Sequence, residues 1–426
     1  MIYIMLGFYN VVLFFFLVLS FPFVWKRIKP DKKFPGDWKE RFAFYGRDVS
    51  ARLKKKKNVW IHTVSIGEFL SVNPLISELK RKENVVVTLA TKTGRGVSES
   101  KFSDITSLFF PVDLYPVMLN AVRKINPKLI VVVETEIWPS LLKIASDRKI
   151  PVILINGRIS PSSFPMYKKG RFFIGRFLRL FSAITMRNPA EAERIISMGA
   201  EKEKIEVVGS MKFDLAYEMG RNINPRDIRE RYRLPEREKG VIVFGSIHPM
   251  EERPLIEAAE RLLEKYRDIL VVMVPRYLEK TGVYKILSEK KISYLRKSLL
   301  GEIRKDFSVL VVDTYGELNN FYSICDMAFV GASLTPWGGQ NPIEPTAFKK
   351  PVLFGNYNWH FLEEWRSIKE GGGGIEVDSY ESLYTEMTGL IENPSLASEI
   401  GQKGYAVLLE NRGATKKNLL AISRFL

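Results

Sequence analysis

Short apolar runs alternate with amphipathic stretches along the first half of the chain. The apolar runs predict buried strands at 58–64 (NVWIHTV), 84–90 (NVVVTLA), 129–133 (LIVVV) and 152–155 (VILI). Between them, the spacing of apolar residues predicts helices such as 69–81 and 116–125. Strands that are apolar throughout are typical of a parallel sheet with both faces covered, so the pattern predicts an α/β domain.

The alternation stops at 213–238, a polar and charged stretch without a strand, and then resumes. Further strands are predicted at 240–245 (GVIVFG), 269–274 (ILVVMV), 309–312 (VLVV), 327–330 and 352–354. We therefore expect two Rossmann-like, doubly wound domains joined by a linker. Two such halves with a cleft between them form the GT-B arrangement of nucleotide-sugar transferases, but periodicity alone equally allows two unrelated Rossmann-like domains.

The chain begins with an apolar stretch, because residues 2–25 contain no charged side chain. A helix over 2–21 is roughly 30 Å long, which matches the hydrocarbon core of a bilayer. A cleavable signal peptide needs a basic start and a cleavage site of small residues, and neither is present. Pro22 is expected to weaken the helix where the span ends. We therefore predict a transmembrane anchor rather than a buried core helix.

The net charge of +17 is concentrated in the first half of the chain. Residues 1–220 carry 36 Lys and Arg against 20 Asp and Glu, and residues 26–57 alone carry 13 basic against 4 acidic side chains. This excess predicts an anionic partner, which is a membrane, a phosphorylated lipid or a nucleic acid. Basic residues directly behind an apolar helix also place the body of the protein in the cytoplasm.

The remaining composition excludes several other classes of protein. Cys325 is the only cysteine, so neither an internal disulfide nor a cysteine-based zinc site is available. The three histidines, His62, His248 and His360, are far apart and form no HExxH motif. No GxGxxG or GxxxxGK[ST] motif follows a predicted strand, so a dinucleotide site and a P-loop are both unsupported.

Carboxylates follow two predicted strands of the first half. Ser65 and Glu68 come after the strand at 58–64 and have the spacing of a helix capping box, but they also lie at the edge of the sheet where α/β sites form. Glu134 and Glu136 follow the strand at 129–133, where two carboxylates are costly unless they are paired or used. An ExE pair is compatible with a metal, but no DxD occurs in the chain, so a metal-independent transferase is favoured.

Two basic features of the first half also allow more than one interpretation. Lys212 lies where the first domain is expected to end and can neutralise an anionic donor, although a surface pair with Asp214 is equally consistent. The stretch 166–187 (MYKKGRFFIGRFLRLFSAITMR) mixes bulky apolar residues with six Lys and Arg side chains. It suits a helix on an anionic membrane, and it equally suits a core helix with a solvated basic face.

Polar side chains also follow successive strands of the second half. Arg276 comes after Pro275 at the end of one strand, and its guanidinium suits a phosphate or a carboxylate. The segment 313–318 (DTYGEL) ends the next strand in the same way. A glycine-bearing loop at 331–340 then leads into 341–344 (NPIE), which has the signature of a helix start. A helix start behind such a loop is an anion site, and its glutamate can accept hydrogen bonds from ribose hydroxyls.

Taken in order, these motifs resemble those of the 3-deoxy-D-manno-octulosonic acid (Kdo) transferases of glycosyltransferase family 30, which act on lipid A precursors in Gram-negative envelopes. The resemblance covers nearly the whole chain, and the ordered set is specific although each motif is weak alone. It comprises the anchor, Trp60 with His62, 65–68, 134–139, 156–160, 209–214, Gly245-Ser246-x-His248, Pro275-Arg276, 313–318 and 338–345.

The resemblance implies a GT-B enzyme of lipopolysaccharide core biosynthesis that needs no metal or other cofactor, takes CMP-Kdo as donor and inverts the anomeric centre. It implies that Glu68 is the general base toward the acceptor hydroxyl and that Glu136 and Lys212 stabilise the transition state. Inversion is consistent with one carboxylate base and no covalent intermediate. The CMP-sugar would be bound by Pro275, Arg276, Gly316, Glu317, Leu318, Asn341, Pro342, Ile343 and Glu344.

Two positions depart from the pattern of the family. The family usually has His after the Pro-Arg pair, where this chain has Tyr277, so the role of that side chain is open while the role of Arg276 is not affected. The family usually has Ala between Asn156 and Arg158, where this chain has Gly157, which is a minor change.

With this resemblance, the expected organisation has six parts. They are a transmembrane anchor at 1–25, a basic juxtamembrane segment at 26–57, an acceptor-binding domain at 58–220, a linker at 221–238, a CMP-sugar-binding domain at 239–410 and a C-terminal helix at 411–426 that packs back on the first domain. We expect the enzyme at the inner membrane, with its catalytic body on the cytoplasmic face, in contact with an anionic membrane surface and without a nucleic-acid partner.

Two alternatives belong to other classes. One is a GT-B transferase that uses a UDP-sugar on another lipid acceptor. The other is a non-catalytic, membrane-tethered protein that binds anionic lipid or nucleic acid. The second alternative explains the basic first half, but it does not explain the polar residues at successive strand ends of both halves.

Overall fold

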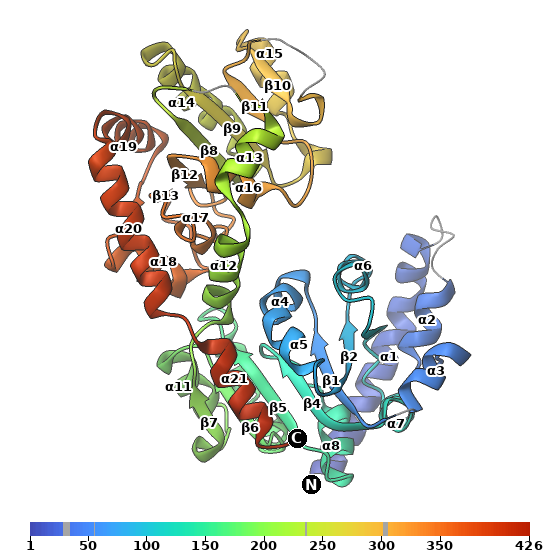
Figure 1. Cartoon of the computed structure of the whole chain (residues 1–426). Helices are drawn as coiled ribbons and strands as arrows, with labels where there is room; N and C mark the ends of the chain where they lie inside the picture. The colour runs from blue at the N-terminus through green and yellow to red at the C-terminus, as the bar shows by residue number, and fades with distance from the viewer. Residues whose placement is uncertain (29–34, 55, 235–236, 301–305) are drawn as a thin grey trace. The chain divides into compact units, whose positions relative to one another are not determined.

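The computed structural model describes residues 1–28, 35–54, 56–234, 237–300 and 306–426, with side chains at 21–37 left outside the description. Parts of the basic segment predicted at 26–57 and of the linker predicted at 221–238 therefore lie outside the described residues. The chain forms two compact units (Figure 1). The first unit comprises Met1–Leu215 and Arg412–Leu426, and the second comprises Ala216–Asn411.

The first unit is built on a seven-stranded parallel sheet with the order β3-β2-β1-β4-β5-β6-β7. The chain winds outward from β1 in one direction and then restarts at β4 in the other, so the predicted doubly wound fold is confirmed. Its strands are β1 (Asn58–Thr63), β2 (Asn84–Leu89), β3 (Thr106–Phe109), β4 (Pro127–Val133), β5 (Val152–Gly157), β6 (Ala183–Met186) and β7 (Ile205–Val207).

Both faces of this sheet are buried, which explains why its strands are apolar throughout. Along β1, Trp60 belongs to the hydrophobic cluster on one face, while Val59 and Ile61 belong to the cluster on the other. The helices of this unit are α1 (Ile2–Ile28), α2 (Pro35–Arg41), α3 (Arg47–Lys54), α4 (Ile66–Ser71), α5 (Asn73–Leu79), α6 (Lys92–Lys101), α7 (Tyr115–Ile125), α8 (Pro139–Asp147), α9 (Phe164–Lys169), α10 (Arg171–Leu178), α11 (Pro189–Ser197) and α21 (Ala414–Ser423).

The second unit repeats this plan. Its seven-stranded parallel sheet has the order β10-β11-β9-β8-β12-β13-β14, again wound outward from a central first strand. The strands are β8 (Val241–Ile247), β9 (Leu270–Pro275), β10 (Tyr294–Arg296), β11 (Val309–Val311), β12 (Met327–Val330), β13 (Val352–Phe354) and β14 (Gly374–Glu376). The helices are α12 (Met211–Asn222, which begins in the first unit), α13 (Pro225–Tyr232), α14 (Glu252–Lys265), α15 (Val283–Glu289), α16 (Leu318–Ile324), α17 (Ile343–Thr346), α18 (Leu362–Glu370), α19 (Tyr380–Glu392) and α20 (Pro394–Glu410).

The segment that we expected to be a linker is largely built into the second unit. Helix α13 occupies its centre, and Ile228 and Tyr232 on this helix are buried. The ring of Tyr232 stacks on Phe321 of α16 with 5.1 Å between ring centroids. The polar composition of this stretch reflects the solvated face of an amphipathic helix, which a search for strands does not detect.

The stretch 166–187 is also not one helix. Helices α9 and α10 end at Leu178, and the strand β6 follows at Ala183–Met186. The β-branched residues Ile184 and Thr185 are buried in the sheet, and Arg187 is buried behind them. Only α9 and α10 therefore remain available for a surface role.

Helix α1 differs from the expected anchor at one point. It continues through Pro22 to Ile28, where we expected it to weaken. A proline removes one backbone hydrogen bond, and a long helix can tolerate this loss. The described part Ile2–Ser20 is long and apolar enough to be a candidate membrane span.

The C-terminal helix α21 lies against the first sheet near β5 and β6 (Figure 1). Its contact with the sheet is polar at the centre, because the buried Asn418 accepts a hydrogen bond from the Thr185 hydroxyl (2.6 Å) and donates one to the carbonyl of Ala414 (2.8 Å). The Asp214 carboxylate accepts hydrogen bonds from the backbone N–H groups of Gly413 (2.7 Å) and Thr415 (2.6 Å) and thereby caps the helix.

We predict that Asn418→Ala loosens this helix. The substitution removes the shorter of the two acceptors of the buried Thr185 hydroxyl and leaves only the Leu154 carbonyl at 3.4 Å, and a lost buried hydrogen bond costs about 1–3 kcal/mol. Hydrogen–deuterium exchange of the α21 amides should become faster by a corresponding factor. Lys416→Ala, at an exposed position of the same helix, is the control and should leave exchange nearly unchanged. Equal exchange in both variants would show that Asn418 does not hold the helix.

Candidate active site

The switch point of the first sheet brings the predicted carboxylates together. Strands β1 and β4 are neighbours, with His62 opposite Val132, although these two residues are 70 positions apart in the sequence. The segment that carries Glu68 follows β1, and the segment that carries Glu134 and Glu136 follows β4. Ligands of doubly wound sheets bind at this edge, where the winding direction reverses.

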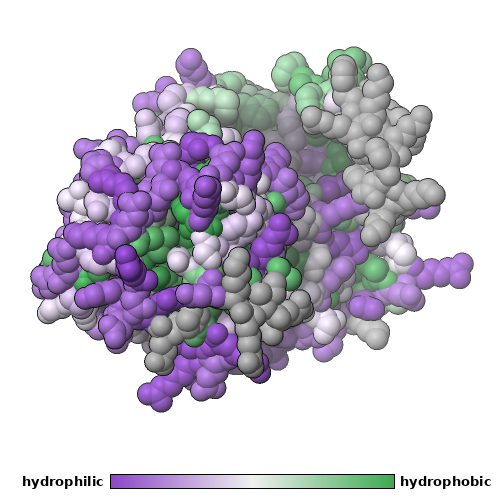
Figure 2. All heavy atoms as spheres, turned by 90° about the horizontal axis from the view of Figure 1, so that it is seen from above, coloured by the Kyte–Doolittle hydropathy of each residue, from purple (hydrophilic) through white to green (hydrophobic). Residues whose placement is uncertain are grey.

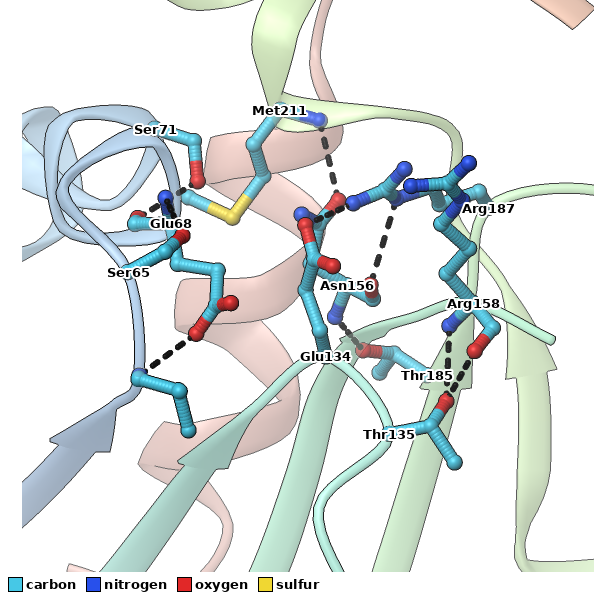
Figure 3. Close-up of polar contacts among 11 residues, drawn as sticks. Ser65, Glu68, Ser71, Glu134, Thr135, Asn156, Arg158, Thr185, Arg187 and Met211 are labelled. Atoms are coloured by element: carbon cyan, nitrogen blue, oxygen red, sulfur yellow. Dashed lines mark hydrogen bonds and ion pairs between the residues drawn. The ribbon is translucent and has the colours of Figure 1, made fainter. Parts of the chain in front are cut away.

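Glu68 is held at the start of α4 by the capping interaction that its spacing predicts. Ser65 is the N-cap, and its hydroxyl accepts a hydrogen bond from the Glu68 backbone N–H (3.2 Å). The Glu68 carboxylate in turn accepts from the backbone N–H of Val64 (2.6 Å) (Figure 3). Burial and the charge of Glu134 raise the pKa of Glu68, although the hydrogen bonds from Val64 and Ser65 oppose the shift.

Glu134 is the most constrained of the three carboxylates. Its backbone lies in the left-handed region with φ of 61°, which is unusual for a residue with a Cβ atom. Its side chain forms an ion pair with the buried guanidinium of Arg187, which also donates through Nε to the carbonyl of Asn156 (3.3 Å). Figure 3 shows Glu134 beside Glu68 and turned toward Arg187.

Glu136 has a strongly raised pKa. Burial raises its pKa from 4.5 to about 7, and the charges of Glu68 and Glu134 add to the effect. The effect extends to α9, where burial and the charge of Glu136 raise the pKa of Tyr167. The three carboxylates therefore form one electrostatically coupled group.

Lys212 is tied to this group through the backbone. It lies half-buried in the first turn of α12, and the N–H of the preceding Met211 donates to Oδ1 of Asn156 (3.2 Å). Asn156 therefore binds Arg187 through its carbonyl and the start of α12 through its side chain. Asp214, which we considered as a surface partner for Lys212, is buried, and its carboxylate caps α21.

The predicted donor-binding residues lie together at the corresponding edge of the second sheet. Strands β11, β9, β8 and β12 are consecutive neighbours, so the segments after them meet at one edge. Arg276 follows β9, its side chain is exposed, and its backbone N–H donates to the carbonyl of Ile247 at the end of β8 (2.8 Å). Pro275 is the last residue of β9.

The segment after β12 has the expected character of a helix start, displaced by one residue. Oδ1 of Asn341 accepts from the backbone N–H of Ile343 (3.2 Å), while its amide donates to the Glu344 carboxylate (3.1 Å). Helix α17 begins at Ile343, so Pro342 rather than Asn341 stands at its cap. Burial raises the pKa of Glu344, although Asn341 and the charge of Arg276 oppose the shift.

The segment after β11 is held by Glu317. Burial alone would raise the pKa of this carboxyl, but hydrogen bonds from Lys297, Thr314 and Tyr232 outweigh it and lower the pKa. The distances are 2.6 Å to Lys297 and 2.9 Å to Tyr232. Gly316 adopts φ of 83°, a conformation that favours glycine, and Leu318 begins α16. Glu317 is thus satisfied within the protein, and the turn before it is left exposed at the edge.

His248 is a functional candidate to which we gave no role from sequence. It is buried, its ring lies between those of Tyr277 (5.2 Å) and Trp337 (4.9 Å), and neither ring nitrogen has a hydrogen-bond partner among the described residues. Burial lowers its pKa, and the charges of Arg276 and His360 add to the effect. Tyr277, the residue that departs from the family pattern, is 40% exposed and packs edge-on against this ring.

The structure brings the predicted site residues together within each unit. Glu68, Glu136 and Lys212 all belong to the first unit, and the nine predicted donor-binding residues all belong to the second.

Sequence reasoning missed Arg187, because we read it as part of a basic helix. The β-branched run directly before it was the signal for a strand that ends at this residue. Within the described ranges, no group of three or more His, Cys, Asp or Glu side chains is placed to hold a metal ion.

Two doubly wound units with polar residues at both switch points define an α/β protein with a GT-B-like fold. Among solved structures, the UDP-GlcNAc 2-epimerase from Neisseria meningitidis matches with a TM-score of 0.61 and 15% identity, over 87% of this chain and 100% of that chain. A glycosyltransferase from Rickettsia africae matches with a TM-score of 0.59 and 16% identity, over 87% and 99% of the two chains. At these identities the similarity concerns the fold alone.

Sequence comparison defines the family. The profile described as 3-Deoxy-D-manno-octulosonic-acid transferase (kdotransferase) matches residues 36–215. The 3-deoxy-D-manno-octulosonic acid transferase of Haemophilus influenzae is 31% identical over 91% of this chain and 91% of that protein. The enzyme of the same name from Aquifex aeolicus is 29% identical over 79% and 86%. The chain belongs to the Kdo transferase family, and the resemblance noted from its motifs is confirmed.

We predict that Glu136→Gln makes the protein more stable at pH 8 than at pH 5, relative to the wild type. A carboxyl with a raised pKa stabilises the folded state below its ordinary pKa of 4.5, and this contribution is lost as the pH rises through about 7. Glutamine does not ionise, so at pH 8 the variant avoids a penalty on the order of 1–3 kcal/mol. Unfolding midpoints at the two pH values measure the effect.

Glu78→Gln is the matched control for this prediction. Glu78 lies on α5 with its side chain 50% exposed, so its substitution should shift the midpoint equally at both pH values. A pH-independent difference between Glu136→Gln and the wild type would show that Glu136 titrates normally.

Proposed function

We propose that this enzyme transfers Kdo from CMP-Kdo to a lipid A precursor of the lipid IVA type, with inversion and without a metal ion. In this reaction an acceptor hydroxyl attacks the anomeric carbon of Kdo and loses its proton to a base. The bond between that carbon and the phosphate oxygen breaks, and CMP leaves with the electron pair. The relatives named above support Kdo transfer, and the residues at the two switch points support the finer assignment.

The observation that carries the proposal is the raised pKa of Glu68 at the switch point of the first sheet. A carboxylate with a raised pKa is a stronger base toward a hydroxyl proton. The N-cap interaction with Ser65 and the bond from Val64 fix the carboxylate in one orientation. A fixed, partly buried carboxylate is suited to deprotonate a hydroxyl that is presented at the same edge.

Glu136 and Lys212 are assigned to the transition state. Glycosyl transfer develops positive charge on the sugar ring and negative charge on the leaving phosphate. We assign Glu136 to the ring and Lys212 to the negative charge, because preorganised charges of opposite sign stabilise these changes. The coupling of Glu136 to Glu68 means that proton transfer to Glu68 relieves repulsion within the group.

The donor is assigned to the edge of the second sheet. The guanidinium of Arg276 suits the phosphate of CMP or the carboxylate of Kdo. The carboxylate of Glu344 is presented by the turn at Asn341, where it can accept hydrogen bonds from the ribose hydroxyls. The remaining predicted residues lie at the strand end, the turns and the helix starts that border this edge, and they are Pro275, Gly316, Glu317, Leu318, Pro342 and Ile343.

The location of the enzyme follows from its acceptor and from α1. A lipid A precursor is an acylated amphiphile that stays in the bilayer, so its transferase must work at a membrane surface. We propose that α1 holds the enzyme on the inner membrane, with the catalytic body on the cytoplasmic face and against anionic lipid. The net charge of the chain, +17, favours that surface.

We predict that Glu68→Gln lowers kcat by about 10²–10⁴-fold while the KM for the donor changes little, because a general base contributes this much. The measurement uses CMP-Kdo, a tetra-acylated lipid A precursor and mass analysis of the products. Glu78→Gln, an exposed position on α5, is the matched control and should retain full activity. Full activity of Glu68→Gln would exclude its role as the base.

A competition measurement separates the donor from the UDP-sugar alternative. CMP should inhibit transfer by the wild type, and UDP at the same concentration should not. Inhibition by UDP alone would exclude CMP-Kdo as the donor, even if Glu68 proved to be the base.

A further inference from the structure

Helix α1 is covered along one side and exposed along the other. Leu6 is buried, and half-buried residues continue the covered side at Ile2, Tyr9, Leu13 and Leu17. These positions repeat at helical spacing, and Ile2, Leu6 and Tyr9 among them pack against the hydrophobic core of the first unit. The opposite side exposes large apolar side chains, among them Ile4 (77% exposed), Phe8 (69%), Val11 (55%), Phe15 (57%) and Val18 (52%).

Specific polar contacts fix the covered side of α1 to the body of the protein. The Asn10 amide donates to the Ser140 hydroxyl of α8 (3.2 Å), and its Oδ1 accepts from the Tyr115 backbone N–H at the start of α7 (2.6 Å). Two turns earlier, the hydroxyl of the largely exposed Tyr3 accepts from Lys143 (2.7 Å) and donates to Asp147 (3.2 Å). The helix is therefore docked through polar groups as well as through apolar packing.

This docking is incompatible with a helix that crosses a bilayer. A spanning helix needs hydrocarbon around it over roughly 30 Å. Here the contacts with Lys143, Asp147 and Ser140 would have to be drawn into that layer together with the body of the first unit. Charged side chains and polar loops are costly in hydrocarbon. The docked helix can instead lie in the plane of the membrane, with only its exposed side in lipid.

Helices α9 and α10 extend the same exposed surface. Arg176 on α10 lies 3.0 Å from the sulfur of Met1, and the ring of Phe173 lies 6.4 Å from that of Tyr9. On these two helices Met166 is 68% exposed and Phe172 is 64% exposed. The basic residues here are Lys168, Lys169, Arg171 and Arg176.

We propose that the exposed side of α1 and the exposed residues of α9 and α10 form one membrane-docking surface, which seats the first unit on an anionic phospholipid bilayer with α1 in the membrane plane. The apolar residues enter the boundary between headgroups and acyl chains, and the basic residues pair with anionic headgroups. The apolar character of α1 contrasts with the mostly hydrophilic face of the molecule shown in Figure 2.

The docking surface adjoins the carboxylate group of the candidate active site. Tyr167 of α9 lies close enough to Glu136 for the carboxylate to raise the pKa of its hydroxyl, while Met166, the preceding residue, is exposed to solvent. On the proposed function, this arrangement would present the base to a hydroxyl at the headgroup level of an embedded acceptor. Helix α1 would then orient the first unit rather than only tether it.

The depth of α1 in the bilayer tests this proposal without donor or acceptor, so its failure is distinguishable from failure of the proposed reaction. Ile4→Cys, Val11→Cys and Val18→Cys each place a nitroxide on the exposed side, and the only native thiol, Cys325, is buried. Power saturation is measured on the full chain in vesicles of phosphatidylcholine and phosphatidylglycerol. Ser423→Cys, an exposed position on α21, serves as the control in water.

An in-plane helix should place all three labels at the same shallow depth, about 5–10 Å below the headgroups. A spanning helix should instead place the label at position 11 deepest, about 10 Å deeper than those at 4 and 18, because seven residues rise by that distance. The second result would overturn the proposal.

Asn10→Leu tests whether docking orients the enzyme. The variant keeps α1 apolar and membrane-bound but removes both contacts of Asn10 with α7 and α8. Transfer to an acceptor embedded in vesicles should fall at least several-fold, while transfer to the same acceptor dispersed in detergent should stay at the wild-type level. Lys416→Leu, at an exposed position of α21 outside the docking surface, is the control. Equal activity of Asn10→Leu and Lys416→Leu on vesicles would exclude an orienting role.

Discussion

Three carboxylates meet at one edge of the first sheet, and the buried guanidinium of Arg187 is the interaction on which this arrangement depends. Burial and mutual repulsion disfavour ionised carboxylates, and a single paired cation offsets part of this cost. Arg187 pairs with Glu134, whose charge in turn raises the pKa of Glu68 and Glu136. The same arginine binds the carbonyl of Asn156, so one ion pair supports both the basicity of Glu68 and the start of α12.

Four of the ten non-glycine residues that have positive φ in the described part of the chain lie beside the two switch points. Glu134 and Asn156 adopt φ of 61° and 53° beside the first switch point, and Ser246 and Ala332 adopt 55° and 60° beside the second. Such conformations cost on the order of 1–3 kcal/mol each and persist only where surrounding bonds hold them. At Ala332 the bond is to the buried carboxylate of Glu251, which also accepts from the next two backbone N–H groups (3.2 and 3.4 Å). Buried polar groups thus fix the direction in which the backbone leaves the central strands.

The sequence predicted the parts of the fold that depend on local pattern. Long apolar strands and the helix that begins at Ser65 were visible because buried parallel strands are apolar throughout and caps have a fixed spacing. The edge strand β7 was missed, because it is three residues long and partly exposed. Arg187 was misplaced for a related reason, since β6 follows a basic amphipathic stretch without a break. Contacts such as Asp214 with α21 join residues about 200 apart, so no local pattern reveals them.

Hydropathy measures the length of an apolar segment, but it does not say which sides of that segment meet lipid. In α1 a single polar residue distinguishes a docked helix from a spanning one. Asn10 is the one residue of the apolar run 2–17 whose side chain carries an amide. An isolated spanning helix can satisfy this amide only through its own backbone, as in the bond from Asn10 to the Leu6 carbonyl (2.9 Å), whereas a docked helix also uses both ends of the side chain, one toward Ser140 and one toward Tyr115. The acceptor gives a reason for the docked form. A hydroxyl at the headgroup level can reach a buried base only if the enzyme sits at a defined height and tilt. A rigid in-plane helix beside a basic surface sets both, while a flexible tether sets neither.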